Sequence, residues 1–184
     1  MRRWIAALML MCLLLTGCSS EKNALQPALD FRSQLLEHHG CAYQAEVSAD
    51  YGDHVYEFSL DCAFDGENGR ITVTAPESIR GISAAVSGAD CKMTFDGVVL
   101  DFGVCGNAAP LSVPCLLGTA WQSDYIASCG ADGEYQRVTM IKGYGEEELT
   151  IDTWLSDGVP AFADVSADGV SVLRVRISDF TLRD

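Results

Sequence analysis

Cysteine is the residue type in this sequence with the widest chemistry, because a thiol can form a disulfide, bind a metal or carry a lipid. The chain has eight cysteines, and no two of them form a C-x-x-C pair, which argues against thioredoxin-like and zinc-ribbon sites. Apart from Cys12 and Cys18, six remain: Cys41, Cys62, Cys91, Cys105, Cys115 and Cys129. An even number in an exported chain favours disulfides, whereas free buried thiols are the alternative, and both interpretations stay open.

Cys41 and Cys62 are the pair that we expect to be neighbours. Antiparallel pairing about a turn near Gly52 brings these two cysteines close together on one face. Directly opposed Cβ atoms lie ~4.5–5.5 Å apart, near the range of a disulfide. We predict that the two are neighbours, and that they form a bridge in an oxidising compartment.

Cys18 lies at the end of a secretory leader. Arg2 and Arg3 precede an apolar run over 4–15, which is of signal-peptide length and too short to span a bilayer comfortably. The sequence Leu-Thr-Gly-Cys at 15–18 resembles a bacterial lipobox, in which cleavage precedes the cysteine and its thiol receives a diacylglyceryl group. We therefore predict a signal peptide over 1–17 and lipidation of Cys18. Cleavage at an Ala-x-Ala-like site, which would leave Cys18 a free thiol, is the alternative, but no such motif is present.

The predicted mature chain is a polar tether over 18–23 followed by one domain over 24–184. Its length suits one hydrophobic core. The net charge of −14 becomes −16 when the leader with its two arginines is removed. This acidity argues against nucleic acid as a partner, and the absence of a polybasic run after Cys18 argues against electrostatic docking on anionic lipid. The predicted location is extracytoplasmic, on the cell membrane or, in a diderm host, the outer membrane.

Other groupings of reactive residues are weak candidates for a site. His38, His39 and Cys41 lack a second ligand pair at zinc spacing, so we interpret the histidines as residues that favour a helix C-terminus and predict no metal site. Ser123, Asp124 and His54 have the residue types of a catalytic triad, but Ser and Asp are so common in turns that this grouping is a very weak signal. The carboxylates Glu57 and Asp61 fit a solvated strand face. Motifs of hydrolases, metalloproteases, P-loop proteins and Rossmann enzymes are absent, so the sequence predicts a non-enzymatic protein without a cofactor.

The hydrophobic pattern predicts a mainly β protein of the α+β class. An amphipathic helix is expected over 24–39, with Pro27 in its first turn and Gly40 just after its end. Apolar and polar residues then alternate through about ten strands, with tight Asp-Gly turns at 96–97, 157–158 and 168–169. A short helix over 115–122 interrupts them and would lie across the sheet as a lid. The predicted architecture is a curved, antiparallel, unclosed β-barrel, and a flat two-sheet sandwich is the alternative.

The element order over 24–182 resembles LolA and LolB, the periplasmic carrier and acceptor of outer-membrane lipoproteins, and the bacterial lipoproteins that share their unclosed barrel. Locally the resemblance rests on the sequences at 76–82 (PESIRGI), 95–97 (FDG) and 177–180 (ISDF). The lipobox fits the acceptor and the Gram-positive relatives, including spore-germination lipoproteins, better than the soluble carrier. The small, polar linkers give no sign of the acceptor's protruding apolar loop.

The resemblance implies a hydrophobic cavity between sheet and helical lid that holds acyl chains or related apolar ligands. Alternating residues on two strand segments are the candidates to line it: Tyr56, Phe58, Leu60, Phe64, Met93 and Phe95. The first functional hypothesis is a membrane-anchored lipoprotein that binds such a ligand or a lipoprotein. The second is an accessory scaffold that binds a cell-envelope protein, for example in sporulation or germination, with a cavity filled by its own side chains.

Overall fold

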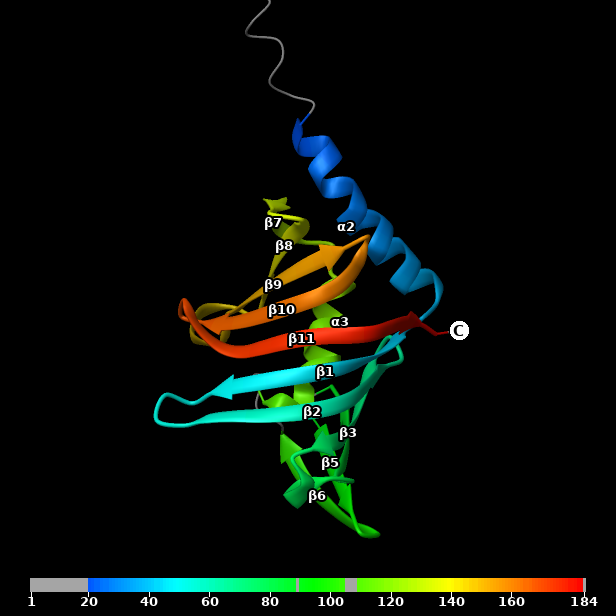
Figure 1. Cartoon of the computed structure of the whole chain (residues 1–184), viewed down its shortest axis with the longest axis vertical. Helices are drawn as coiled ribbons and strands as arrows, with labels where there is room; N and C mark the ends of the chain where they lie inside the picture. Colours follow the sequence, from blue (N-terminus) through cyan, green and yellow to red (C-terminus); the bar gives the residue numbers. More distant parts are fainter. Residues whose placement is uncertain (1–19, 89, 105–108, 184) are drawn as a thin grey trace, which may run out of the picture.

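The computed structural model describes residues 20–88, 90–104 and 109–183, and it confirms the predicted fold class. One antiparallel sheet of eleven strands contains most of the chain, and it is accompanied by two α-helices (Figure 1). The helices are α2 (Ser20–Glu37) and α3 (Val113–Trp121). The first six strands are β1 (Cys41–Asp50), β2 (Val55–Phe64), β3 (Asn68–Ala75), β4 (Ser83–Ser87), β5 (Asp90–Phe95) and β6 (Val98–Val104). The other five are β7 (Ile126–Asp132), β8 (Tyr135–Lys142), β9 (Leu149–Ser156), β10 (Val159–Ala167) and β11 (Val170–Leu182).

The strand order is β6-β5-β4-β3-β2-β1-β11-β10-β9-β8-β7. Each half of the chain thus forms a meander of sequential neighbours, and the pairing of β1 with β11 joins the two halves. Strands β6 and β7 are the two edges of the sheet, and α3 belongs to the connection between them. In Figure 1, α3 passes behind β11 and β1. We call the face that contacts α2 and α3 the inner face and the opposite one the outer face.

The Asp-Gly turns have the backbone that a two-residue hairpin requires. Asp96, Asp157 and Asp168 have φ of 49°, 50° and 51°, and the glycine that follows each also has positive φ. Type I′ turns need positive φ at both central residues, and their twist matches that of the flanking strands. The three predicted turns are therefore confirmed.

The first helix differs from its prediction at both ends. It begins at Ser20, so Pro27 lies inside it and not in its first turn, and the segment assigned to a tether is partly helical. The apolar pattern could not reveal this, because a polar first turn carries no periodic signal. At the other end, His39 has φ of 61° and takes the left-handed position expected for Gly40. Gly40 is needed for another reason: a Cβ there would lie 2.2 Å from the carbonyl oxygen of Phe64.

Helix α3 is buried on nearly all sides, with Thr119 its only exposed residue. A helix that is apolar all round belongs in a core and not on a surface. It contacts β2, β3 and β8, so it bridges both halves of the sheet as the predicted lid should. A Cβ at Gly118 would lie 2.4 Å from the ring of Phe64, so the helix approaches β2 closely only because this residue is glycine.

Candidate functional site

The six residues predicted to line a cavity all lie on the inner face, but their side chains differ in how far they are buried. The register pairs Phe58 with the buried Val47 and pairs Met93 with the buried Ala84. Leu60 and Phe64 are each 2% exposed and belong to the core, whereas Phe58 and Met93 are half-buried. Tyr56 and Phe95 are 48% and 47% exposed, because they lie near hairpin tips. Their role in ligand binding stays a prediction.

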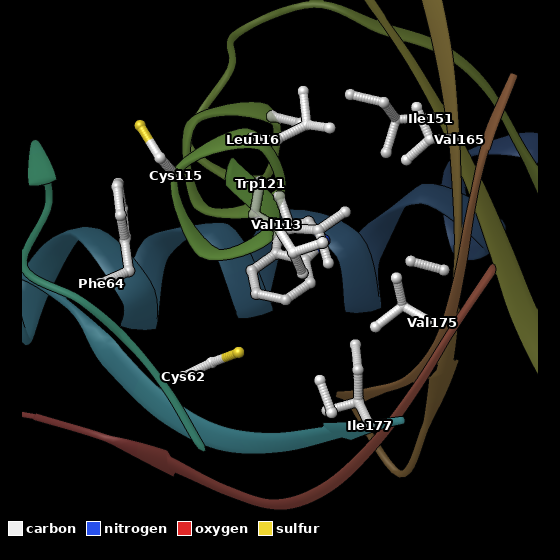
Figure 2. Close-up of a cluster of buried hydrophobic side chains, with 14 of the residues drawn as sticks. Cys62, Phe64, Val113, Cys115, Leu116, Trp121, Ile151, Val165, Val175 and Ile177 are labelled. Carbon is white, nitrogen blue, oxygen red and sulfur yellow. The ribbon is translucent and has the colours of Figure 1, made fainter. Parts of the chain in front are cut away.

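Large side chains fill the space over the middle of the inner face. Phe31 of α2, Tyr43 of β1, Trp121 of α3 and Phe180 of β11 form a cluster with ring centroids 5.7–6.1 Å apart. The indole Nε1 of Trp121 donates a hydrogen bond of 3.0 Å to the hydroxyl of the buried Thr153. Figure 2 shows α3 enclosed by side chains of the sheet, with Phe64 and Cys62 on one side and Ile151, Val165 and Val175 on the other.

The pocket beside Trp121 on this face is small. An apolar pocket of about 20 Å³ lies between α2, Trp121 and strands β7 to β9. One water molecule needs ~10–15 Å³ of such space, so this pocket has room for about one water molecule and not for an acyl chain. An acyl ligand on this face would have to displace α2 or the side chain of Trp121.

Cys41 and Cys62 lie near each other in the register of β1 and β2, and a bridge between them in an oxidising compartment stays a prediction. Cys62 lies opposite Tyr43, and Cys41 lies opposite Phe64, which places both thiols on the inner face at diagonal positions. Both are buried free thiols, as is Cys115. Burial raises the pKa of Cys41 to about 12. Burial, together with the charge of Asp61 and the Cys41 thiol, raises the pKa of Cys62 to about 12. Deprotonation, and hence nucleophilic attack by these thiols, is disfavoured in the folded state.

We therefore expect Cys41 and Cys62 to resist alkylation in the native protein. At pH 8 a thiol with a pKa near 12 is ionised to ~10⁻⁴, so its reaction should be at least ~10³-fold slower than that of an ordinary cysteine. Iodoacetamide labelling followed by peptide mass spectrometry, with and without urea, measures this protection. Labelling at the unfolded rate, or a Cys41–Cys62 disulfide in the native protein, would contradict the buried-thiol arrangement.

The residues considered for catalysis are not assembled. His54 stacks on the ring of Tyr56 at the tip of the β1–β2 hairpin, with centroids 6.1 Å apart. Asp124 forms an ion pair with Arg32 of α2, and the Ser123 hydroxyl accepts a 3.1 Å hydrogen bond from the backbone amide of Tyr125. The Arg32–Asp124 ion pair therefore holds the segment after α3 against α2.

The tip of the β5–β6 hairpin is an exposed apolar surface. Phe95, Val98, Val99 and Leu100 at the β5–β6 hairpin are 47–61% exposed, and we call them the hairpin patch. The predicted pairing of Phe95 with Val98 and of Met93 with Leu100 is confirmed. However, the hairpin projects beyond the helices at the lower end of the molecule in Figure 1, so the side chains remain uncovered. Three consecutive apolar residues at 98–100 are the sequence signal, because alternation buries only every second one.

The sequence matches no protein-family model and no curated protein. Solved structures share the fold. A LolA superfamily protein from Nitrosomonas europaea has a TM-score of 0.54 and 13% identity, over 91% of this chain and 95% of that chain. A structure of the CwlD amidase from Clostridioides difficile in complex with the GerS lipoprotein matches with a TM-score of 0.47 and 15% identity. The match covers 90% of this chain and 97% of that chain. LprF from Mycobacterium bovis matches with a TM-score of 0.45 and 15% identity, over 90% of this chain and 98% of that chain.

The first of these comparisons supports the fold, which this chain shares with that LolA superfamily protein, as the resemblance of the sequence predicts. Cys18 and the leader lie outside the described residues, so the predicted lipid anchor is not part of this comparison. Within the described residues, no helix combines the length and the apolar character needed to cross a membrane.

Proposed function

We propose that this chain is a lipid-anchored, extracytoplasmic and non-enzymatic lipoprotein that binds another protein of the cell envelope through its hairpin patch. The observation that carries the proposal is the distribution of apolar side chains: the inner face is filled by Trp121 and its neighbours, while the hairpin patch is exposed. A ligand carrier needs the opposite arrangement, an open interior and a polar surface.

The hairpin patch suits a protein partner on two grounds. Contiguous exposed apolar side chains are uncommon on monomeric proteins and often mark interaction sites. Val98, Val99 and Leu100 lie on the edge strand β6, whose outward-facing backbone amides and carbonyls can pair with a strand of a partner. Asp101 is the only charged residue of β6, so this strand has little protection against such pairing. A partner with an exposed strand and an adjoining apolar surface therefore fits best.

Site-specific cross-linking in the producing cell tests this proposal. A photoreactive amino acid at Val99 should give one predominant adduct with another envelope protein, because this side chain is exposed on the edge strand. The same amino acid at Ser128, exposed on the opposite edge strand β7, is the matched control and should not give that adduct. The substitution Val98→Asp should reduce the adduct at least tenfold. Equal adducts from both positions would contradict the proposal.

Binding of an apolar ligand is the alternative, and it is measured separately. Titration of the purified protein with a fluorescent fatty acid should show no saturable binding, since the inner pocket is too small. Saturable binding of one fatty acid per chain, abolished by a bulky substitution at Ala28 beside the pocket, would favour the carrier interpretation.

A further inference from the structure

A groove of about 920 Å³ crosses the outer face of the sheet. Its lining residues come from seven adjacent strands, β3, β2, β1, β11, β10, β9 and β8. With strands ~4.8 Å apart, such a groove is ~29 Å long and runs across the strands. It lies on the side of the sheet away from α3, which is turned toward the viewer in Figure 1. Neither the filled interior nor the hairpin patch accounts for it.

Aromatic side chains line this groove, although the solvated face of an antiparallel sheet normally carries polar side chains. Tyr135, Trp154 and Phe162 all line it, and the rings of Tyr135 and Phe162 meet edge to face with centroids 5.4 Å apart. Trp154 is held in place from its polar edge, because its Nε1 donates a 2.8 Å hydrogen bond to Asp132. Three aromatic side chains from neighbouring strands thus form a fixed platform at one end of the groove.

Arginine side chains complete the platform. The guanidinium of Arg176 lies 5.8 Å from the ring centroid of Phe162, and that of Arg137 lies 5.5 Å from the centroid of Trp154. Direct cross-strand pairing links Arg176 to Phe162, Phe162 to Trp154, and Trp154 to Arg137. These four side chains therefore form one continuous row of planar groups across β11, β10, β9 and β8.

Both arginines that line the groove form ion pairs with carboxylates that also line it, and Glu57 is a further acidic residue of the lining. Arg176 pairs with Glu46 at 3.8 Å, and Arg174 pairs with Asp164 at 3.5 Å. A ligand of high charge would have to break these pairs, whereas a neutral polyhydroxylated ligand can share them. Guanidinium and carboxylate groups both offer two hydrogen-bonding positions in one plane, which suits pairs of neighbouring hydroxyls.

We propose that the groove binds a neutral glycan, a chain of linked pyranose rings. The aromatic surfaces that the guanidinium groups leave uncovered attract the C–H faces of sugars, while the arginine–carboxylate pairs bind the hydroxyls. The open, elongated shape admits a chain that continues at both ends. This inference does not depend on the partner protein, because the groove and the hairpin patch are on separate elements.

Titration of the purified mature protein with two hexasaccharides tests the inference. One is β-1,4-linked N-acetylglucosamine and the other is β-1,4-linked glucose. We expect tryptophan fluorescence to report saturable binding of at least one, with a Kd below ~1 mM. Arg176→Ala, which removes an exposed side chain, and Trp154→Ala should each weaken that binding at least tenfold.

Matched control variants lie outside the groove. Arg80→Ala removes an exposed, ion-paired arginine next to a 3-10 helix, and Tyr144→Ala removes an aromatic side chain that is 93% exposed. Both should bind as the unchanged protein does. Circular dichroism melts of every variant separate loss of the groove from loss of the fold. The inference is overturned if neither hexasaccharide binds, or if Arg176→Ala binds as tightly as Arg80→Ala.

Discussion

Replacing Trp121 by alanine is expected to cost ~3–5 kcal/mol of the free energy of unfolding, the largest loss that we predict for a single side chain. Trp121 is 3% exposed and contacts aromatic rings from α2, β1 and β11. Its removal leaves a void among elements that are far apart in the sequence. It also leaves the buried hydroxyl of Thr153 without the indole donor. Urea unfolding followed by circular dichroism measures the loss.

Two substitutions serve as controls for this prediction. Trp121→Phe keeps most of the apolar volume but removes the donor, so an intermediate loss of ~1–2 kcal/mol is expected. Trp154→Ala deletes the same side chain from the half-buried outer face, where water fills the space, and should cost less than Trp121→Ala. If Trp121→Ala lost no more than Trp154→Ala, the inner face would not be a packed core. An open interior, which a ligand carrier requires, would then be present, and the carrier interpretation would be favoured.

Substitution of Cys18 by serine is expected to abolish retention on the membrane. Serine has no thiol to accept the diacylglyceryl group, so the variant should be released or should stall as the uncleaved precursor. Two or three acyl chains, at ~0.8 kcal/mol for each buried methylene, anchor a protein far more firmly than one chain. Because α2 begins at Ser20, the anchor would also hold this helix close to the bilayer. Membrane fractionation with intact-mass measurement gives the outcome.

Cys12→Ser is the matched control, because it changes a cysteine inside the leader that is not directly preceded by a cleavage site in our interpretation. This variant should remain in the membrane fraction at the mature, lipidated mass. If Cys18→Ser stayed in the membrane at the mass of the unchanged mature protein, the anchor assignment would be wrong.

The sequence by itself determined most of the strand pairing. Alternation of apolar and polar residues fixed which face of each strand is buried, since a slip by one residue would reverse every side chain. The Asp-Gly pairs fixed three of the turns, because few other residues adopt positive φ at both central positions. Helix α3 was also predictable in position, since Pro110, Pro114 and Gly118 interrupt the strand pattern. These are local signals, and they sufficed for the LolA-like fold.

Only the tertiary structure decided which apolar residues are covered. Leu60 and Phe95 have the same pattern in the sequence and share the inner face, yet one is 2% and the other 47% exposed. The difference arises because α2 and α3 cover the middle of the sheet and leave the tip of the β5–β6 hairpin uncovered. The outer groove likewise exists only after β1 and β11 pair and bring both halves of the chain into one sheet. Burial depends on neighbours that are distant in sequence, which no local pattern records.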